Sequence, residues 1–259
     1  MSDLDLILDA AREAGALALA AREGGLKIWS KDGGSPVTDA DLAVDALLTT
    51  RLRKARPDYG WLSEETVDDP ARLSTRRQFL VDPIDGTVAF MKGKPWFAVS
   101  IAVVEDGRPI AGVVHAPALD ETYAAVLGGG ATLNGGAISP SATSDLEDAA
   151  MLGDAKMFQH PAWPTPWPAM RVESRNSIAY RICLVAAGAF DAAIALSPKS
   201  EWDLAAADLI RAEAGAVLTD HKGRDFTYNH AKPLFPSLVC ANPALAPLIL
   251  SRVGHIDLP

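Results

Sequence analysis

Asp82-Pro83-Ile84-Asp85-Gly86-Thr87 is the most constraining stretch of this chain. It follows an apolar run at residues 78–81, which is typical of a buried strand ending at Asp82. The carboxylates of Asp82 and Asp85 are three residues apart, and they repel each other unless a cation or a proton lies between them. If Pro83 forces a turn, both side chains converge on one point. Hard cations such as Mg²⁺ prefer oxygen ligands of this kind.

The six residues alone permit a second interpretation. Asp-Gly pairs often mark turns, and in a type I turn both aspartates would cap backbone N–H groups. In a metal site, the carbonyl of Ile84 would add an oxygen ligand. Gly86 and Thr87 would then begin a helix or tight turn, whose free N–H groups form a natural phosphate site. The hexapeptide therefore leaves a metal site and a plain turn as alternatives.

The composition indicates an ordinary globular protein. The chain has 259 residues, of which 49% are hydrophobic and 22% are charged. That is enough for one large α/β domain or for two halves that share a core. The formal net charge of −9 argues against binding to nucleic acid or to an anionic membrane. An acidic protein that acts on an anionic substrate needs local positive charge, which bound cations would supply.

Cysteine usage and the first residues predict a cytoplasmic protein. The sequence has two cysteines, Cys183 and Cys240, both in apolar stretches, and they fit a reducing compartment. The chain opens Ser2-Asp3-Leu4-Asp5, which is acidic where a signal peptide is basic. No apolar run is long enough for a bilayer-spanning helix. We therefore expect a cytoplasmic location and no membrane partner.

Hydrophobic periodicity predicts helices at the start of the chain and strands in its middle. A helix is expected at residues 4–22 and another at residues 39–56, the second with Thr38 as N-cap, and a loop joins them at residues 27–37. A β-hairpin follows, with its turn at Asp106-Gly107. The predicted strands here are residues 98–105, 109–115 and 122–126.

The C-terminal part alternates between helices and strands. Alternation of this kind favours a layered α/β architecture. We predict an N-terminal α+β half, residues 1–145, that carries most metal ligands. The C-terminal α/β half, residues 146–259, would supply Asp203 and substrate contacts, and the two halves count as one domain or two. The predicted elements are helix 178–188, strand 191–196, helix 204–214, strands 216–219 and 237–241, and helix 244–252.

Three other acidic segments are ambiguous one by one. Glu64-Glu65 follows a predicted strand, so one carboxylate would point inward, but isolated pairs are more often solvated. Trp202-Asp203 precedes a predicted helix, where an aspartate is a favoured N-cap. Thr38-Asp39-Ala40-Asp41 is likewise typical of a capped helix start. Together with the hexapeptide, however, these segments offer a ring of oxygen ligands.

Four blocks in this order and spacing carry a resemblance to a known family. The chain resembles the inositol monophosphatase superfamily, which consists of Mg²⁺-dependent, lithium-sensitive phosphomonoesterases. The resemblance implies an α/β (α+β) fold, a layered αβαβα sandwich of the inositol monophosphatase and sugar phosphatase type, commonly in a homodimer. The blocks are Ser35-Pro36-Val37-Thr38-Asp39-Ala40-Asp41, Leu62-Ser63-Glu64-Glu65-Thr66, Asp82-Pro83-Ile84-Asp85-Gly86-Thr87 and Trp202-Asp203-Leu204-Ala205-Ala206.

The resemblance also implies a set of metal ligands. Glu64, Asp82 and the Ile84 carbonyl would hold one Mg²⁺. Asp82, Asp85 and Asp203 would hold a second, with Asp82 shared between the two ions. A third, weaker Mg²⁺ near Glu64 is common in the superfamily.

Catalytic and substrate-binding roles follow from the same resemblance. Asp41 and Thr87, together with Glu64, would be catalytic, and the first two would position the water that attacks phosphorus in line. Gly86 and Thr87 would bind phosphate oxygens through their backbone N–H groups. Ser177 and Lys199 are the predicted further substrate contacts, although Lys199 is also typical of a solvated surface lysine.

Departures from the family pattern leave the substrate open. Leu196 stands where inositol monophosphatases usually carry a glutamate that binds substrate hydroxyls. The usual Arg-x-Gly-Ser/Thr stretch appears as Arg175-Asn176-Ser177-Ile178, which we interpret with Asn176 in place of glycine. In these departures the chain resembles the superfamily branch that acts on 3'(2'),5'-bisphosphate nucleotides. Histidinol phosphatase is a third relative.

We therefore expect an Mg²⁺-dependent phosphomonoesterase of a small soluble phosphate monoester such as inositol 1-phosphate, in which metal-activated water attacks phosphorus. A 3'(2'),5'-bisphosphate nucleotidase and a histidinol phosphatase are alternatives within the superfamily. A regulatory binding protein with dispensable catalysis is the alternative from a different class. The intact acidic set favours the enzyme.

Overall fold

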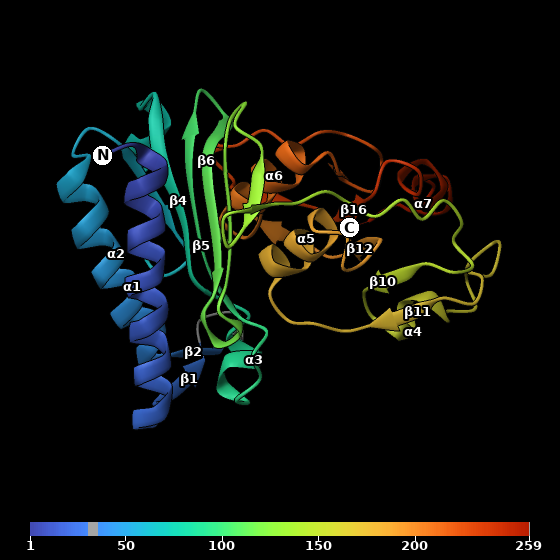
Figure 1. Cartoon of the computed structure of the whole chain (residues 1–259), viewed down its shortest axis with the longest axis horizontal. Coiled ribbons are helices and arrows are strands. Elements are labelled where there is room, and N and C mark those ends of the chain that lie inside the picture. The colour runs from blue at the N-terminus through green and yellow to red at the C-terminus, as the bar shows by residue number, and fades with distance from the viewer. Residues whose placement is uncertain (31–35, 259) are drawn as a thin grey trace.

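The structure is a computed structural model that describes residues 1–30 and 36–258. Within that part of the chain, layers of helices and sheets alternate across the molecule (Figure 1). Two helices cover a seven-stranded sheet, two further helices separate it from a five-stranded sheet, and helices lie on the far side of the second sheet. This order of layers is αβαβα, so the predicted fold class is confirmed.

The outer helical layer consists of α1 (Asp3–Gly24) and α2 (Asp39–Ala55), which pack on each other and on the sheet. Both helices begin with a capping box. The hydroxyl of Ser2 or Thr38 accepts the N3 backbone N–H, and the aspartate at N3 binds back to the N-cap backbone. The two helices predicted at the start of the chain are therefore confirmed. Among the described helices, none has the length and hydropathy that crossing a membrane requires.

The seven-stranded sheet contains the predicted hairpin. Strands β5 (Ala98–Glu105) and β6 (Arg108–Ala116) are antiparallel and meet at the Asp106-Gly107 turn. The pair β3–β4 is parallel, and the other neighbouring strands are antiparallel. In sheet order, the remaining strands are β3 (Gly60–Ser63) and β4 (Arg77–Asp85) on one side of the hairpin, and β7 (Glu121–Val126), β8 (Ala131–Leu133) and β9 (Gly136–Ala137) on the other.

Strand β4 is longer than predicted and is irregular at the hexapeptide. We expected it to end at Asp82, but its pairing with β5 continues to Asp85. Asp82 pairs with Ser100 and Asp85 with Ala98, so four residues of β4 face three of β5. Such a β-bulge adds one residue to a strand, and Pro83 is tolerated there. Because residues three apart in a regular strand point to opposite faces, the extra residue lets the two aspartates point to the same side.

The inner helical layer lies between the two sheets and contains α5 (Ile178–Ala186) and α6 (Glu201–Ala214). Both helices contact the seven-stranded sheet as well as the five-stranded one. On its other face the five-stranded sheet packs against α7 (Ala246–Val253) and the short α4 (Ala155–Phe158). In sheet order its strands are β11 (Arg171–Glu173), β10 (Ala150–Leu152), β12 (Ala192–Ala195), β16 (Leu238–Ala241) and β14 (Val217–Thr219).

The predicted loop at residues 27–37 is only partly correct. It contains two short antiparallel strands, β1 (Ile28–Ser30) and β2 (Pro36–Thr38). Residues 31–35, which include Gly33-Gly34 and Ser35, lie outside the described residues. The strands were missed because three residues with no clear alternation carry almost no periodic signal.

The predicted start of α6 is wrong. The helix begins at Glu201, three residues before Leu204, because Ser200 is its N-cap. Asp203 is therefore not an N-cap but occupies N3, where its Oδ2 accepts the Ser200 N–H at 2.9 Å. This capping box fixes one carboxylate oxygen of Asp203 and leaves the other to point away from the helix.

A central hydrophobic cluster contains residues of both halves. The chain leaves the seven-stranded sheet after β9 and enters the five-stranded sheet at β10. Buried residues of both sheets, such as Leu80 and Leu238, belong to the same cluster. The division into residues 1–145 and 146–259 stays a prediction. The remaining short elements are α3 (Thr87–Met91), the 3-10 turns η1 (Pro70–Ser74) and η2 (Pro117–Leu119), and the paired strands β13 (Lys199–Ser200) and β15 (Leu234–Phe235).

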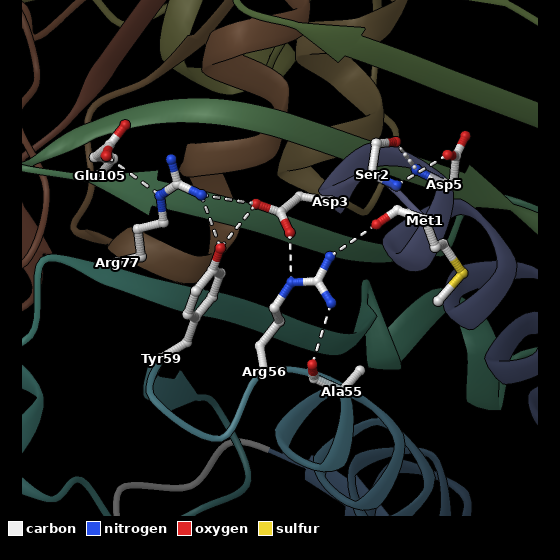
Figure 2. A network of polar contacts seen from close by, with 9 residues as sticks. All are labelled: Met1, Ser2, Asp3, Asp5, Ala55, Arg56, Tyr59, Arg77 and Glu105. Carbon is white, nitrogen blue, oxygen red and sulfur yellow. Dashed lines mark hydrogen bonds and ion pairs between the residues drawn. The ribbon is translucent and has the colours of Figure 1, made fainter.

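A polar network at the start of α1 ties the outer helices to the sheet (Figure 2). The carboxylate of Asp3 accepts hydrogen bonds from Arg56 Nε at 2.9 Å and from the Tyr59 hydroxyl at 3.0 Å. The guanidinium of Arg77 then donates to the Tyr59 hydroxyl at 2.9 Å and to Glu105 at 3.2 Å. The network therefore links α1, the end of α2, β4 and β5 around one shared carboxylate.

Gly112 of β6 marks the closest approach of α6 to the seven-stranded sheet. A Cβ atom at this position would lie 2.7 Å from the Ala206 carbonyl oxygen and 3.1 Å from its Cα. Because both atoms belong to helix backbone, α6 would have to move. We expect Gly112→Ala to lower the free energy of unfolding by about 1–3 kcal/mol, as overpacking does. Chemical denaturation measures this change.

Gly24→Ala is the matched control. A Cβ atom there would meet nothing within 4 Å, and the residue is the last of α1. Alanine at such a position should leave stability unchanged or raise it slightly. Equal stability of the two variants would contradict the close helix–sheet contact at Gly112.

Candidate active site

Three carboxylates from separate parts of the chain meet at one edge of the seven-stranded sheet. Strands β3 and β4 are parallel, so Glu64, just after β3, and Asp82, near the end of β4, lie at the same edge. Asp203 reaches this edge from the first turn of α6. One carboxylate oxygen of each residue lies within 4.8 Å of the other two. The structure thus brings together three of the predicted metal ligands.

These carboxylates line a shallow pocket with a volume of about 210 Å³. The pocket also contains the glycine turn that follows β4. Its acidic residues outnumber its neutral polar ones, and no lysine, arginine or histidine of the described chain lines it. The lining residues are Pro36, Glu64, Asp82, Asp85, Gly86, Thr87, Val88, Asn176 and Asp203.

Both interpretations of the hexapeptide hold in part. Asp82 Oδ1 accepts the Ile84 N–H at 3.1 Å, as in a turn. Asp85 Oδ2 accepts the Ser177 hydroxyl at 2.6 Å and the Ala179 N–H at 2.7 Å, at the N-terminus of α5. Each aspartate therefore uses an oxygen to bind backbone. These bonds fix the carboxylates in the pocket, so capping and a metal site are compatible.

Burial and like charge dominate the electrostatics of the pocket. Burial raises the pKa of Asp82 well above its usual range, and the nearby charges of Glu64, Asp85 and Asp203 raise it further. Burial also raises the pKa of Asp85 to about 6, although its hydrogen bonds to α5 oppose the shift. Asp203 has a raised pKa for the same reason, with Asp85 as the next cause. A bound cation would offset this repulsion and hold the carboxyls ionised.

The donor atoms of the pocket fit a hard divalent cation. The side-chain atoms that meet there are carboxylate oxygens, while Ile84, whose carbonyl is a predicted ligand, is not among the residues that line the pocket. The described residues nearby include no cysteine or histidine that would favour a softer metal. Two of the carboxylates, Asp82 and Asp85, are only 1% and 7% exposed. Buried charges of one sign without a countercharge are costly, so this arrangement is one that a bound cation would stabilise.

The predicted catalytic pair, Asp41 and Thr87, lies beside the carboxylates. Asp41 is buried, and its Oδ2 accepts the Thr38 N–H at 2.8 Å and the Thr38 hydroxyl at 2.6 Å. Thr87 Oγ lies 3.4 Å from Asp41 Oδ1 and 3.2 Å from the Ile84 carbonyl oxygen. Because a hydroxyl has one hydrogen, Thr87 can donate to only one of these two acceptors at a time.

Gly86 cannot be replaced without moving the backbone of the pocket. Its φ of +94° lies in the left-handed region that favours glycine. A Cβ atom would lie 2.9 Å from the Ser177 backbone nitrogen and 3.0 Å from the Trp96 carbonyl oxygen. The glycine therefore allows the turn after β4 to contact the start of α5.

The glycine position of the Arg-x-Gly-Ser/Thr stretch is occupied by Ser177 and not by Asn176, which corrects our interpretation of the sequence. Ser177 has a φ of +63°, the left-handed conformation for which glycine is favoured. Its hydroxyl donates to Asp85 and accepts the Tyr180 N–H at 3.1 Å. The predicted substrate contact of Ser177 stays a prediction, and these internal bonds instead give it a role in positioning Asp85. Asn176, which we had not named as a contact, is exposed and lines the pocket.

Lys199 lies in β13, outside the lining of the pocket. Its ammonium group donates to the Pro198 carbonyl at 2.8 Å and to the Ser197 hydroxyl at 2.9 Å, and the Ser197 carbonyl is 3.3 Å away. Burial lowers the pKa of this lysine. The predicted contact of Lys199 with the substrate stays a prediction, and these acceptors compete with it.

Asp45 holds the loop that carries Glu64, a role that sequence reasoning missed. Its Oδ1 accepts the Ser63 hydroxyl at 2.5 Å and its Oδ2 accepts the Thr66 hydroxyl at 2.8 Å. The two bonds hold Ser63, directly before Glu64, and Thr66, two residues after it. The available signal was its spacing, because Asp45 follows Asp41 by one helical turn and therefore lies on the same buried face of α2.

Solved structures share both the architecture and the length of this chain. The structure superposes on an IMPase from Thermotoga maritima with a TM-score of 0.86, at 29% sequence identity over 98% of each chain. The layered sandwich and the acidic pocket at the sheet edge thus define a phosphatase of this fold.

The chain belongs to the inositol monophosphatase family, which it matches over residues 3–257. It is 36% identical to the histidinol-phosphatase of Mycobacterium tuberculosis over 88% of both chains. It is 32% identical to the 3'(2'),5'-bisphosphate nucleotidase CysQ of Aggregatibacter actinomycetemcomitans over 86% of both chains. The suspected family is therefore confirmed. The names of these relatives differ in substrate, so membership of the family does not identify the substrate of this chain.

Asp82→Asn should raise the melting temperature at pH 7 when a chelator removes divalent cations. The change deletes one buried charge from a repelling cluster, and asparagine keeps an oxygen for the Ile84 N–H. Differential scanning calorimetry measures the effect. An unchanged or lower melting temperature would contradict the inferred repulsion.

The same cluster predicts a pH dependence in the absence of divalent cations. The pKa of Asp85 is about 6 in the folded protein against an ordinary value of 3.8, and that of Asp82 is also raised. The folded state therefore binds more protons than the unfolded state. The stabilisation that comes from protonating these carboxyl groups is fully present below about pH 4, and it is lost as the pH rises through 6. The melting temperature of the wild-type protein should fall between pH 5 and pH 7, and that of Asp82→Asn should fall by less. A steeper loss in the variant would count against this assignment.

Proposed function

We propose that this chain is an Mg²⁺-dependent phosphomonoesterase that hydrolyses a small soluble phosphate monoester. The observation that carries the proposal is the meeting of Glu64, Asp82 and Asp203, whose carboxylate oxygens lie within 4.8 Å of one another. Buried and half-buried carboxylates at this spacing, next to a glycine turn, are suited to cations that in turn bind a phosphate. The membership of the inositol monophosphatase family supports the same reaction.

Two or three Mg²⁺ ions are proposed, as the family resemblance implies. Glu64, Asp82 and the Ile84 carbonyl would hold one ion, and Asp82, Asp85 and Asp203 the second. When bound, Mg²⁺ lowers the pKa of a water and draws charge from the phosphate oxygens. The hydrogen bonds of Asp85 to α5 and of Asp203 to Ser200 fix one oxygen of each carboxylate. This orients the other oxygen toward the pocket before any ion binds.

Asp41 and Thr87 would position the attacking water. Asp41 Oδ2 is taken by two bonds from Thr38, so Oδ1 is the oxygen that faces Thr87. When the Thr87 hydroxyl donates to Asp41 Oδ1, its own lone pairs can accept a hydrogen from water. The pair would thereby hold the water on one side of the phosphate and pass a proton toward Asp41.

The turn at Gly86 would bind the phosphate. The carbonyl of Gly86 accepts the N–H groups of Ala89 and Phe90, so it begins the hydrogen-bonded turns of α3. The N–H groups of Gly86 and Thr87, the predicted phosphate contacts, and that of Val88 precede the first intrahelical donor, Ala89, and would be available to phosphate oxygens. The pocket has no cationic side chain in the described chain, so these N–H groups and the Mg²⁺ ions would supply its positive potential.

The substrate is proposed to be a small monoester such as inositol 1-phosphate. A histidinol phosphate substrate is the second candidate, because a relative with that activity in its name is 36% identical over 88% of this chain. A 3'(2'),5'-bisphosphate nucleotide is the third, in line with the relative named CysQ. The millimolar lithium sensitivity of the family is proposed for this chain as well.

The cellular location and the oligomeric state of the enzyme are also proposed. The free thiols Cys183 and Cys240 are both buried, which supports a reducing compartment such as the cytoplasm. A homodimer is proposed from the family resemblance. A regulatory role with dispensable catalysis is the alternative from a different class, and the intact set of acidic residues favours the enzyme.

Asp82→Asn should lower the rate of phosphate release at saturating Mg²⁺ by at least about 100-fold, because it removes the shared carboxylate. The exposed Asp106 of the β5–β6 turn provides the matched control, Asp106→Asn, whose left-handed backbone suits asparagine. A colorimetric phosphate assay measures both variants. Wild-type turnover by Asp82→Asn would exclude the proposed site.

A three-substrate comparison would identify the substrate. It measures phosphate release from inositol 1-phosphate, histidinol phosphate and adenosine 3',5'-bisphosphate, each with Mg²⁺ and with a chelator. We expect release from at least one compound, only with Mg²⁺, and kcat/KM ranks the three. Failure to hydrolyse any of them would support the regulatory alternative.

A further inference from the structure

A polar bridge with two buried charges at its centre connects the loop after Glu64 to the start of α6. It consists of Asp68, Arg72, Asn229, His230 and Glu201, and we refer to it as the Arg72 bridge. Arg72 and Asn229 are 157 residues apart in the sequence, so the bridge joins distant segments of the chain. No part of it touches the pocket, and neither the family resemblance nor the sequence motifs include it.

Arg72 is the centre of the bridge. Its side chain is 1% exposed, and its guanidinium binds both carboxylate oxygens of Asp68, at 2.6 and 2.9 Å. It also donates to the Asn229 side-chain oxygen at 2.8 Å and to the His230 carbonyl at 2.9 Å. A planar guanidinium with acceptors on two sides fixes their relative positions more rigidly than a lysine would.

Glu201 is the other buried charge of the bridge, with a side chain that is 0% exposed. Its Oε2 accepts the Asn229 N–H at 2.7 Å, and its Oε1 accepts the His230 N–H at 2.9 Å. The His230 ring nitrogen Nδ1 lies 2.6 Å from Oε1. Asn229 therefore links the two charges, since its side chain binds Arg72 and its backbone binds Glu201.

Each end of the bridge lies within four residues, along the chain, of a carboxylate of the candidate active site. At one end, Asp68 follows Glu64 by four residues, in the loop that Asp45 holds through Thr66. At the other end, Glu201 precedes Asp203 by two residues in the first turn of α6. The bridge therefore connects the backbone segments that carry Glu64 and Asp203.

We propose that Arg72 and Glu201 are positioning residues that set the separation of Glu64 and Asp203, and with it the affinity of the site for Mg²⁺. This inference rests on the proposed function. The physical reason is the repulsion between like-charged carboxylates, which favours a larger separation when the backbone segments that carry them are not held in place. Binding of each ion then includes the cost of bringing the carboxylates together, and this cost lowers the affinity. Residues that orient metal ligands typically contribute 10- to 100-fold in metal affinity.

Arg72→Met tests the proposal with the full-length protein. The variant keeps most of the side-chain volume but removes the donors to Asp68, Asn229 and His230. We expect the dissociation constant for Mg²⁺, measured by isothermal titration calorimetry, to rise at least about tenfold. The half-saturating Mg²⁺ concentration for phosphate release should rise in parallel, while kcat at saturating Mg²⁺ falls less.

Tyr228→Phe is the matched control for loss of a buried hydrogen bond. Tyr228 is next to Asn229 in the chain, and its hydroxyl donates to Asp208 of α6 at 2.7 Å, in a network that does not reach the pocket. This variant should lower the melting temperature but leave the Mg²⁺ dissociation constant within about twofold of wild type. A bridge with only a structural role would instead give Arg72→Met and Tyr228→Phe the same unchanged affinity, which would overturn the proposal.

Asn229→Gly provides a second variant if Arg72→Met does not fold. Asn229 has a φ of +70°, a conformation that glycine adopts without strain, so the backbone is preserved while the bond to Arg72 is lost. Its Mg²⁺ affinity should also fall, by about threefold or more, and an unchanged affinity would contradict the proposal. If wild-type protein binds no Mg²⁺ in the titration, the proposed function fails and this inference with it. Binding by wild type with equal binding by both bridge variants overturns the inference alone.

Discussion

Repulsion among buried carboxylates is the constraint on which the rest of this structure depends. Glu64, Asp82, Asp85 and Asp203 crowd one edge of a sheet, and burial raises the pKa values of the last three above their usual range. Without a bound cation, such a cluster of like charges lowers the stability of the folded protein. The fold tolerates it because hydrogen bonds fix one oxygen of Asp82, Asp85 and Asp203, while Asp45 holds the residues on either side of Glu64.

The attachments explain several local features that otherwise look unrelated. The bulge in β4 turns Asp82 and Asp85 toward the same side, and Gly86 then lets the chain contact the start of α5. The N-terminus of α5 binds Asp85, while the capping box of α6 binds Asp203. The residues that support the carboxylates are thus caps and turns, and stability and function use the same hydrogen bonds.

The sequence predicted the layer order, the long helices, the β5–β6 hairpin and the acidic residues that meet, because these leave strong periodic or motif signals. It failed where the outcome depended on tertiary contacts. The start of α6 shifted from Leu204 to Glu201 since Ser200 caps the helix, and the residue in the left-handed conformation is Ser177, whereas we had assigned the glycine position to Asn176. Arg72, Asp45 and Glu201 were missed, because a buried ionic residue looks like a surface one until its partners are known.

The bond between Asp85 and the start of α5 has a consequence for folding kinetics. Its two residues are 94 positions apart, so the contact closes a long loop and forms only when α5 has docked against the end of β4. An ion that binds the completed cluster would therefore stabilise contacts that form late in folding. It should slow unfolding and leave the refolding rate almost unchanged. Bound Mg²⁺ would thus raise the kinetic stability of the native protein without helping the chain to reach its native topology.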